Sequence, residues 1–81
     1  MLEELRHAKR VVGIKQLRRV LKDGKAGTVY LAQDADPRLL EPIQAQCEQN
    51  GVPVVEVATM QELGKACGID VGAAAAATLR Q

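Results

Sequence analysis

The 81-residue chain contains no tryptophan and no phenylalanine, and its one aromatic residue is Tyr30. Modules that read single-stranded nucleic acid by stacking bases on aromatic rings, such as RNA-recognition motifs and OB folds, have no platform here. The core must instead be built from Val, Leu, Ile and Ala. Small side chains of this kind let helices lie close to a sheet, so a compact layered domain is expected.

Cysteine and histidine are also scarce. Cys47 and Cys67 have no cluster of potential ligands near them in the sequence, so we expect buried free thiols rather than a disulfide or a metal site. His7 is the one histidine, and without a second it is expected to be a bystander. No apolar run approaches the ~20 residues of a membrane span, and the charged N-terminus lacks the apolar region of a signal peptide. A cytoplasmic protein without membrane contact is expected.

Catalytic groups are few. Asp34, Asp36 and Glu62 are the candidate acids, with no nucleophile–base pair, phosphate loop or metal cluster to join them. Asp34 and Asp36 are conceivable as an acid/base or Mg²⁺ pair. The favoured interpretation is that Asp36, placed before Pro37, caps a helix whose first turn holds the proline. We therefore expect neither enzymatic activity nor a cofactor.

The net charge of +1 hides an asymmetric distribution. Between Arg6 and Lys25 there are eight basic residues and one acid, whereas from Ala26 onward three basic residues face seven acids. Such a distribution suggests one polyanion-binding face on a mildly acidic body. An ordinary solvated helix face remains the alternative from charge alone.

Most of these cations fall in the segment from Gly13 to Gly24. Its apolar residues, Ile14, Leu17, Val20 and Leu21, share one helical arc, and its polar residues, Lys15, Gln16, Arg18, Arg19 and Lys22, share the other. Gly13 follows a strand-like Val11-Val12 pair, so the helix should begin at a tight turn. Its first backbone N–H groups would then be free to meet a phosphate beside the cationic side chains.

The remaining elements alternate between strand and helix. We expect a helix over Leu2–Lys9, a turn at Lys25-Ala26-Gly27, and strands over Thr28–Ala32 and Val52–Val57. Because a proline inside a helix is unfavourable, Pro42 predicts a turn over Arg38–Leu40 and a separate helix from Glu41 to Gln49, terminated by Asn50-Gly51.

The last third of the chain is less regular. Thr59 and Glu62 form a capping box for a short helix that ends near Gly68. A loop with Ile69, Asp70 and Val71 follows. The run Ala73–Ala77 has high helix propensity, but it is equally suited to a strand buried between two helical layers. The order of elements already predicts an α/β/α sandwich.

Three segments together resemble a known family, the kink-turn-binding ribosomal proteins (the archaeal large-subunit seven-Ae family), in particular its small bacterial YbxF-type branch. The resemblance covers nearly the whole chain, and its motifs stand in order at matching spacing: Gly13-Ile14-Lys15-Gln16, Gln33-Asp34-Ala35-Asp36-Pro37 and Leu63-Gly64-Lys65-Ala66-Cys67-Gly68-Ile69. Two departures are Ile14, where the family often has threonine, and Asp23, where it usually has a basic residue.

The resemblance implies a three-layer α/β/α sandwich with a mixed sheet of about four strands, so that the alanine run becomes a strand. It also implies an RNA-binding surface made of the turn and helix start and of the later loop, with these residues: Gly13, Ile14, Lys15, Gln16, Arg19, Ile69, Asp70 and Val71.

The function that follows is a non-enzymatic, ribosomal-protein-like module, residues 1–81 forming one domain, that stabilises kink-turns in structured RNA such as rRNA or leader RNAs. We expect a monomer, with the ribosome as one candidate partner. The alternative is a small regulatory domain whose basic face binds an acidic protein.

Overall fold

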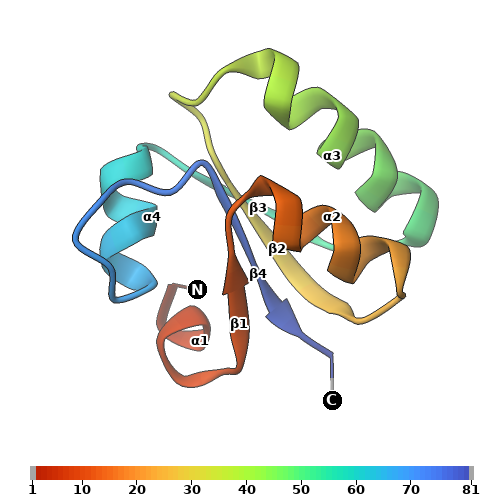
Figure 1. Cartoon of the computed structure of the whole chain (residues 1–81), viewed down its shortest axis with the longest axis horizontal. Coiled ribbons are helices and arrows are strands. Elements are labelled where there is room, and N and C mark those ends of the chain that lie inside the picture. Colours follow the sequence, from red (N-terminus) through yellow and green to blue (C-terminus); the bar gives the residue numbers. More distant parts are fainter. Residues whose placement is uncertain (1, 81) are drawn as a thin grey trace.

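The computed structural model describes residues 2–80, which form four helices and four strands in one small body (Figure 1). The elements in chain order are α1 (Leu2–His7), β1 (Arg10–Val12), α2 (Ile14–Lys22), β2 (Ala26–Ala32), α3 (Pro37–Asn50), β3 (Val54–Val57), α4 (Met60–Ala66) and β4 (Ala75–Leu79).

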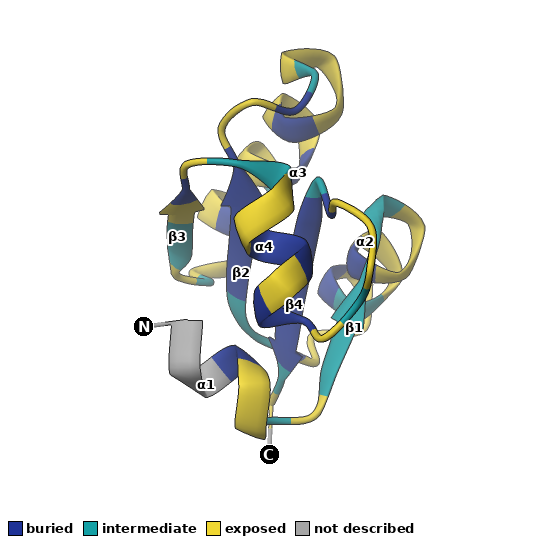
Figure 2. Ribbon diagram, turned by 90° about the vertical axis from the view of Figure 1, so that its left-hand side faces the viewer, coloured by how far each residue is buried: buried dark blue, intermediate teal, exposed yellow. Residues whose placement is uncertain are grey.

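The strands form one mixed sheet in the order β1-β4-β2-β3. β4 pairs antiparallel with both β1 and β2, and β2 pairs parallel with β3. Helices α2 and α3 pack together on one face of this sheet, and α1 and α4 pack on the other (Figures 1 and 2). The predicted α/β/α sandwich with a mixed four-stranded sheet is confirmed.

The alanine run is a central strand, as the family resemblance implied. Ala75, Ala76 and Ala77 are fully buried and lie in register beside Leu31, Tyr30 and Val29 of β2. Because helices cover both faces of the sheet, a strand with the smallest side chains lets them approach closely. Burial between β1 and β2 overrides the helix propensity of alanine, which acts only locally.

The turn predicted at Lys25-Ala26-Gly27 is wrong, since β2 already begins at Ala26. The chain reverses earlier, at Gly24, where the backbone has φ of 70°. Gly27 instead lets β2 lie close to β4, because a Cβ at this position would lie 2.9 Å from Thr78 Oγ1. The β2–β4 register shifts between Ala26 and Val29, and the N–H of Thr28 donates to that Thr78 hydroxyl at 2.9 Å.

The break predicted before Glu41 is also wrong, because α3 is continuous from Pro37 to Asn50 with Pro42 inside it. Pro42 leaves only the carbonyl of Arg38 without its helical donor, and both residues are exposed, so water can hydrate that oxygen. The rest of the prediction holds. Asp36 accepts from the N–H of Arg38, and Gly51, in the left-handed conformation, ends the helix.

Other boundaries differ by a few residues. α1 ends at His7 rather than Lys9, and α4 ends at Ala66, capped by Cys67. β3 begins at Val54 rather than Val52, because the N–H of Val52 closes the end of α3 by donating to Cys47 O at 2.9 Å. Ile43 and Cys47 are fully buried, as expected.

Replacement of Pro42 by alanine should stabilise the protein. The substitution restores an N–H that can donate within the helix, and we expect the free energy of unfolding to rise by about 1–2 kcal/mol after allowance for the more flexible unfolded chain. Urea denaturation measures this. Pro37→Ala is the matched control, because the N–H missing at Pro37 has no helical acceptor. Equal effects of the two substitutions would contradict this account of α3.

Candidate nucleic-acid interface

The turn between β1 and α2 consists of a single residue, Gly13. Its backbone has φ of 105° and ψ of 153°, a conformation that L side chains rarely adopt. The N–H of Gly13 donates to Ala75 O at 3.0 Å, at the point where β4 begins. A glycine is therefore required both for the direct passage from strand to helix and for the exposed backbone at this corner.

Helix α2 divides its side chains as the sequence predicted. Leu17 and Leu21 are buried against the sheet, and Ile14 and Val20 are half-buried beside them. On the opposite side the exposed residues Lys15, Gln16 and Arg19 line an open hollow. Gly13 provides no side-chain cap, so the first backbone N–H groups of the helix remain available to an outside acceptor.

The cations of α2 have no ion-pair partner among the side chains that the structure describes. Among the residues that the structure describes, the one ion pair joins Arg38 to Asp36 at 2.9 Å, on α3. Lys15, Arg19 and Lys22 are all exposed and lie at positions i, i+4 and i+7 of one helix. This row presents positive charge to the solvent beside the Gly13 turn.

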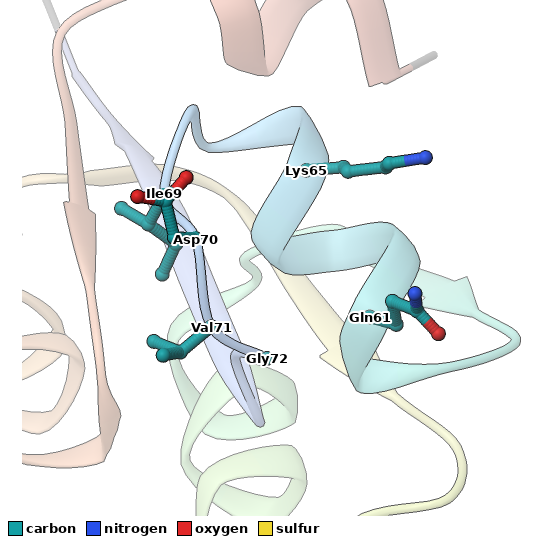
Figure 3. Close-up of a pocket in the computed structure, with 6 residues that line it drawn as sticks. All are labelled: Gln61, Lys65, Ile69, Asp70, Val71 and Gly72. Carbon is teal, nitrogen blue, oxygen red and sulfur yellow. The ribbon is translucent and has the colours of Figure 1, made fainter.

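The second predicted segment is the loop between α4 and β4. Ile69 is half-buried and packs against the core, whereas Asp70 is exposed and the Val71 side chain is 69 % exposed. Figure 3 shows the Val71 side chain on the side of the loop that faces β1 and α2, and Gln61 and Lys65 of α4 line a pocket together with this loop. The two aliphatic residues thus have different roles, since Ile69 anchors the loop and Val71 is presented to solvent.

The backbone of this loop packs directly on α4. A Cβ at Gly64 would overlap the carbonyl group of Val71, so the helix needs a glycine at the contact. Two hydrogen bonds tie the loop to the same helix: the N–H of Ile69 donates to Gly64 O at 3.1 Å and that of Ala73 to Met60 O at 3.0 Å. The position of Val71 is therefore determined by backbone contacts rather than by its side chain.

Arg10 connects this loop to β1, a role that its place in the sequence did not predict. Its Nε and a terminal nitrogen donate to Cys67 O at 3.2 and 2.7 Å, and its other terminal nitrogen donates to Arg6 O at 3.4 Å and Ala8 O at 3.5 Å. One guanidinium thus satisfies carbonyls at the C-terminal ends of both α4 and α1, where a cation is favoured. In the sequence Arg10 is one cation among eight, and nothing distinguishes it.

The two predicted segments therefore lie on one side of the molecule. Residues 68–74 leave α4 at the carbonyl that Arg10 holds and reach β4 at the carbonyl that Gly13 holds, so the loop runs alongside β1 (Figure 1). The start of α2 therefore lies beside the end of the loop that leads into β4.

The candidate acids have structural partners. The Asp36 carboxylate accepts hydrogen bonds from the side chain and from the backbone N–H of Arg38. Both bonds lower the pKa of this carboxyl, the side-chain bond more strongly. Asp34 Oδ1 accepts a hydrogen bond from the N–H of Met60 at 2.8 Å, and Thr59 Oγ1 accepts one from the N–H of Glu62 at 3.1 Å. Asp34 and Thr59 thus bind backbone N–H groups in the first turn of α4. Neither aspartate is arranged as an acid/base pair.

The two cysteines are buried, as the sequence predicted. Cys47 and Cys67 are buried free thiols, and burial raises the pKa of each, with the charge of Arg10 acting in the opposite direction on Cys67. His7 is exposed. Within the described residues, no group of three or more His, Cys, Asp or Glu side chains is placed to hold a metal ion, and no helix is long and apolar enough to cross a membrane.

The fold and this corner define a small α/β/α domain with a cationic, glycine-opened helix start beside an aliphatic loop. The chain belongs to the ribosomal protein L7Ae/L30e/S12e/Gadd45 family, whose model matches residues 2–81. This membership agrees with the resemblance seen in the sequence and with the expectation of a non-enzymatic protein.

Relatives with similar sequences carry RNA-binding names. The RNA-binding protein YbxF of Geobacillus stearothermophilus is 49 % identical over 76 residues, which are 94 % of this chain and 93 % of the relative. The RNA-binding protein GK0100 of Geobacillus kaustophilus is 50 % identical with the same coverage. Among solved structures, the Giardia lamblia 15.5kD RNA binding protein has a TM-score of 0.90 at 29 % identity, covering 99 % of this chain and 71 % of that one.

Replacement of Arg10 by methionine should loosen the loop. Loss of a cation that donates to the Cys67 carbonyl should lower the free energy of unfolding by about 1–2 kcal/mol. Amide exchange at Ile69 and Ala73 should accelerate more than exchange in α2. Lys9→Met, at the exposed neighbouring position, is the control and should change neither quantity appreciably. Unchanged exchange in the Arg10 variant would show that the guanidinium does not hold the loop.

Proposed function

We propose that this protein binds structured RNA and stabilises the bent form of kink-turns, through the corner where the Gly13 turn and the α4–β4 loop lie together. The observation that carries the proposal is the pair of tethers from β1 to this loop, Arg10 to Cys67 O at 2.7 Å and Gly13 N–H to Ala75 O at 3.0 Å. These bonds support the proposal that two segments more than fifty residues apart share one pre-formed surface. Family membership and the names of the relatives support RNA as the ligand.

The helix start supplies polar and cationic groups to this surface. Gly13 lets an RNA backbone approach the protein backbone without a side chain between them. Lys15 and Gln16 are exposed beside it and can donate to base edges, lysine preferring the O6 and N7 acceptors of guanine. Arg19, one turn further, neutralises phosphates that crowd together when the RNA bends.

The loop supplies an aliphatic contact. Val71 is one of two large apolar side chains in the described residues that are exposed, the other being Leu39. Val71 can cover the face of an unstacked base without an aromatic ring, and Asp70 beside it adds an acceptor. Ile69, held against the core, keeps this part of the loop in place.

The mechanism is a shift in a folding equilibrium. A kink-turn RNA exchanges between an extended and a bent form. The protein binds the bent form, because only a bent RNA can contact both protein segments at once. The binding energy offsets the phosphate repulsion in the bend. The whole chain, residues 1–81, acts as one such domain, and we assign it to the cytoplasm as a monomer acting on ribosomal or leader RNAs.

A bend assay tests this function directly. With fluorophores on the two ends of a kink-turn duplex, micromolar protein should raise energy transfer, because the ends approach when the RNA bends. The same duplex without the bulge is the control and should show no rise. Equal binding of both duplexes would point to nonspecific electrostatics, and binding of neither would favour an acidic protein partner.

Substitution of Lys15 and Arg19 by alanine should weaken kink-turn binding and flatten its salt dependence. For every phosphate that the variant no longer neutralises, the slope of log K against log salt should fall by about 0.7–0.9. Arg38→Ala removes a charge from α3, outside both segments, and should leave the slope largely unchanged. A similar loss of slope per removed charge in both variants would contradict the assignment of the site.

A further inference from the structure

A second group of cations lies at the opposite end of the sheet. Lys9, Lys25 and Arg80, here called the far-end patch, flank the start of β1, the start of β2 and the end of β4. Backbone hydrogen bonds hold them together: Leu79 N–H donates to Lys9 O at 2.8 Å, and Arg80 N–H donates to Lys25 O at 2.6 Å. The sequence separates these residues by up to seventy-one positions, and only the sheet unites them.

The order of the strands gives the patch a regular shape. Because β4 lies between β1 and β2, Arg80 is placed between Lys9 and Lys25, with strands separated by about 5 Å. All three side chains are exposed, and none takes part in an ion pair among the side chains that the structure describes, those of residues 5–80. Like charges placed on neighbouring strands repel each other, and a bound anion would relieve that repulsion.

Helix α2 connects the far-end patch with the corner at the Gly13 turn. β4 has five residues, so the two ends of the sheet are about 16 Å apart. α2 starts at the Gly13 corner and is followed by Lys25, with the exposed Lys15, Arg19 and Lys22 along it (Figure 1). Cations therefore recur from one end of the molecule to the other.

The composition of the patch favours a nucleic-acid backbone over a protein partner. The cores of protein–protein interfaces are rich in aromatic and other apolar side chains and poor in charge. The exposed large apolar side chains in the described part of the chain, Leu39 and Val71, are both elsewhere. Charge without an exposed apolar centre is what phosphate contacts require.

We propose that the far-end patch binds the phosphate backbone of one helical arm of the RNA, beyond the kink itself. This inference rests on the proposed function, because the kink at the Gly13 corner fixes where the arm begins. The distance of about 16 Å corresponds to roughly five base pairs of a duplex. An arm that extends past that length contacts the patch, and a shorter arm does not.

The experiment compares two kinds of kink-turn RNA. In the first, both arms have three base pairs and are closed by loops; in the second, one arm is extended to twelve base pairs, each arm in turn. Filter binding is measured over a range of salt concentrations. Extension of one arm should tighten binding by the unmodified protein and steepen its salt dependence. Lys25→Gln with Arg80→Gln should remove about 1.4–1.8 units of slope on the long-arm RNA, whereas this variant should bind the short-arm RNA as the unmodified protein does.

The matched control is Arg38→Gln with Lys65→Gln, which removes the same charge from exposed positions outside the patch. This variant should keep the full effect of arm length. Melting temperatures should agree among the proteins, because the substitutions keep the backbone bonds of Lys25 and Arg80.

Each outcome decides one of the two proposals. Tight binding of the short-arm RNA without any effect of arm length would overturn the far-end patch and leave the proposed function standing. An arm effect that both double variants lose equally would also overturn it, in favour of general electrostatics. Failure to prefer either kink-turn RNA over a duplex without the bulge would instead overturn the proposed function.

Discussion

The hydrogen bond from Gly13 N–H to Ala75 O is the constraint on which the candidate surface depends, because it joins the end of β1 to the start of β4. β4 begins where the α4–β4 loop ends, and α2 begins where β1 ends. One backbone contact therefore places the first turn of α2 beside the end of that loop. Arg10 does the same at the other end of the loop through Cys67 O.

Small residues make this arrangement possible. Ala75 to Ala77 leave space for helices on both faces of the sheet, and Gly64 lets the carbonyl of Val71 lie against α4. A protein of 81 residues without Phe or Trp gains its stability from close packing over a limited area rather than from large side chains. The loop is consequently held by its backbone, which leaves the side chains of Asp70 and Val71 free for a ligand.

The sequence predicted the fold class and the buried and exposed faces of α2, because both depend on local patterns. The period of Leu17 and Leu21, the Gly51 end of α3 and the Asp36 cap are each determined within a few residues. The alanine run was ambiguous because its conformation is decided by two neighbouring strands and two layers of helices. Pro42 predicts a break that does not occur, because the Arg38 carbonyl that loses its helical donor is exposed and water can hydrate it.

The candidate site was predictable only in part, for the same reason. The exposed positions Lys15, Gln16 and Arg19 followed from helical period, whereas the role of the loop with Ile69, Asp70 and Val71 is implied only by the family resemblance. The family resemblance connected these segments, since no pattern within either one refers to the other. The role of Arg10 was not predictable, because a guanidinium that donates to a carbonyl fifty-seven residues away leaves no trace in local spacing.

Arg10, which is held by the protein, and the exposed Lys15 and Arg19 should affect RNA binding in different ways. Arg10 is held by carbonyls of the protein, so its loss would disturb the loop and weaken the binding of a ligand without removing a phosphate contact. Lys15 and Arg19 have no ion-pair partner among the described residues, so their charge is available to phosphates. Counterion release depends on phosphate contacts alone, and a structural cation therefore changes affinity at constant salt slope. Affinity alone does not separate the two roles, but affinity and salt slope measured together do.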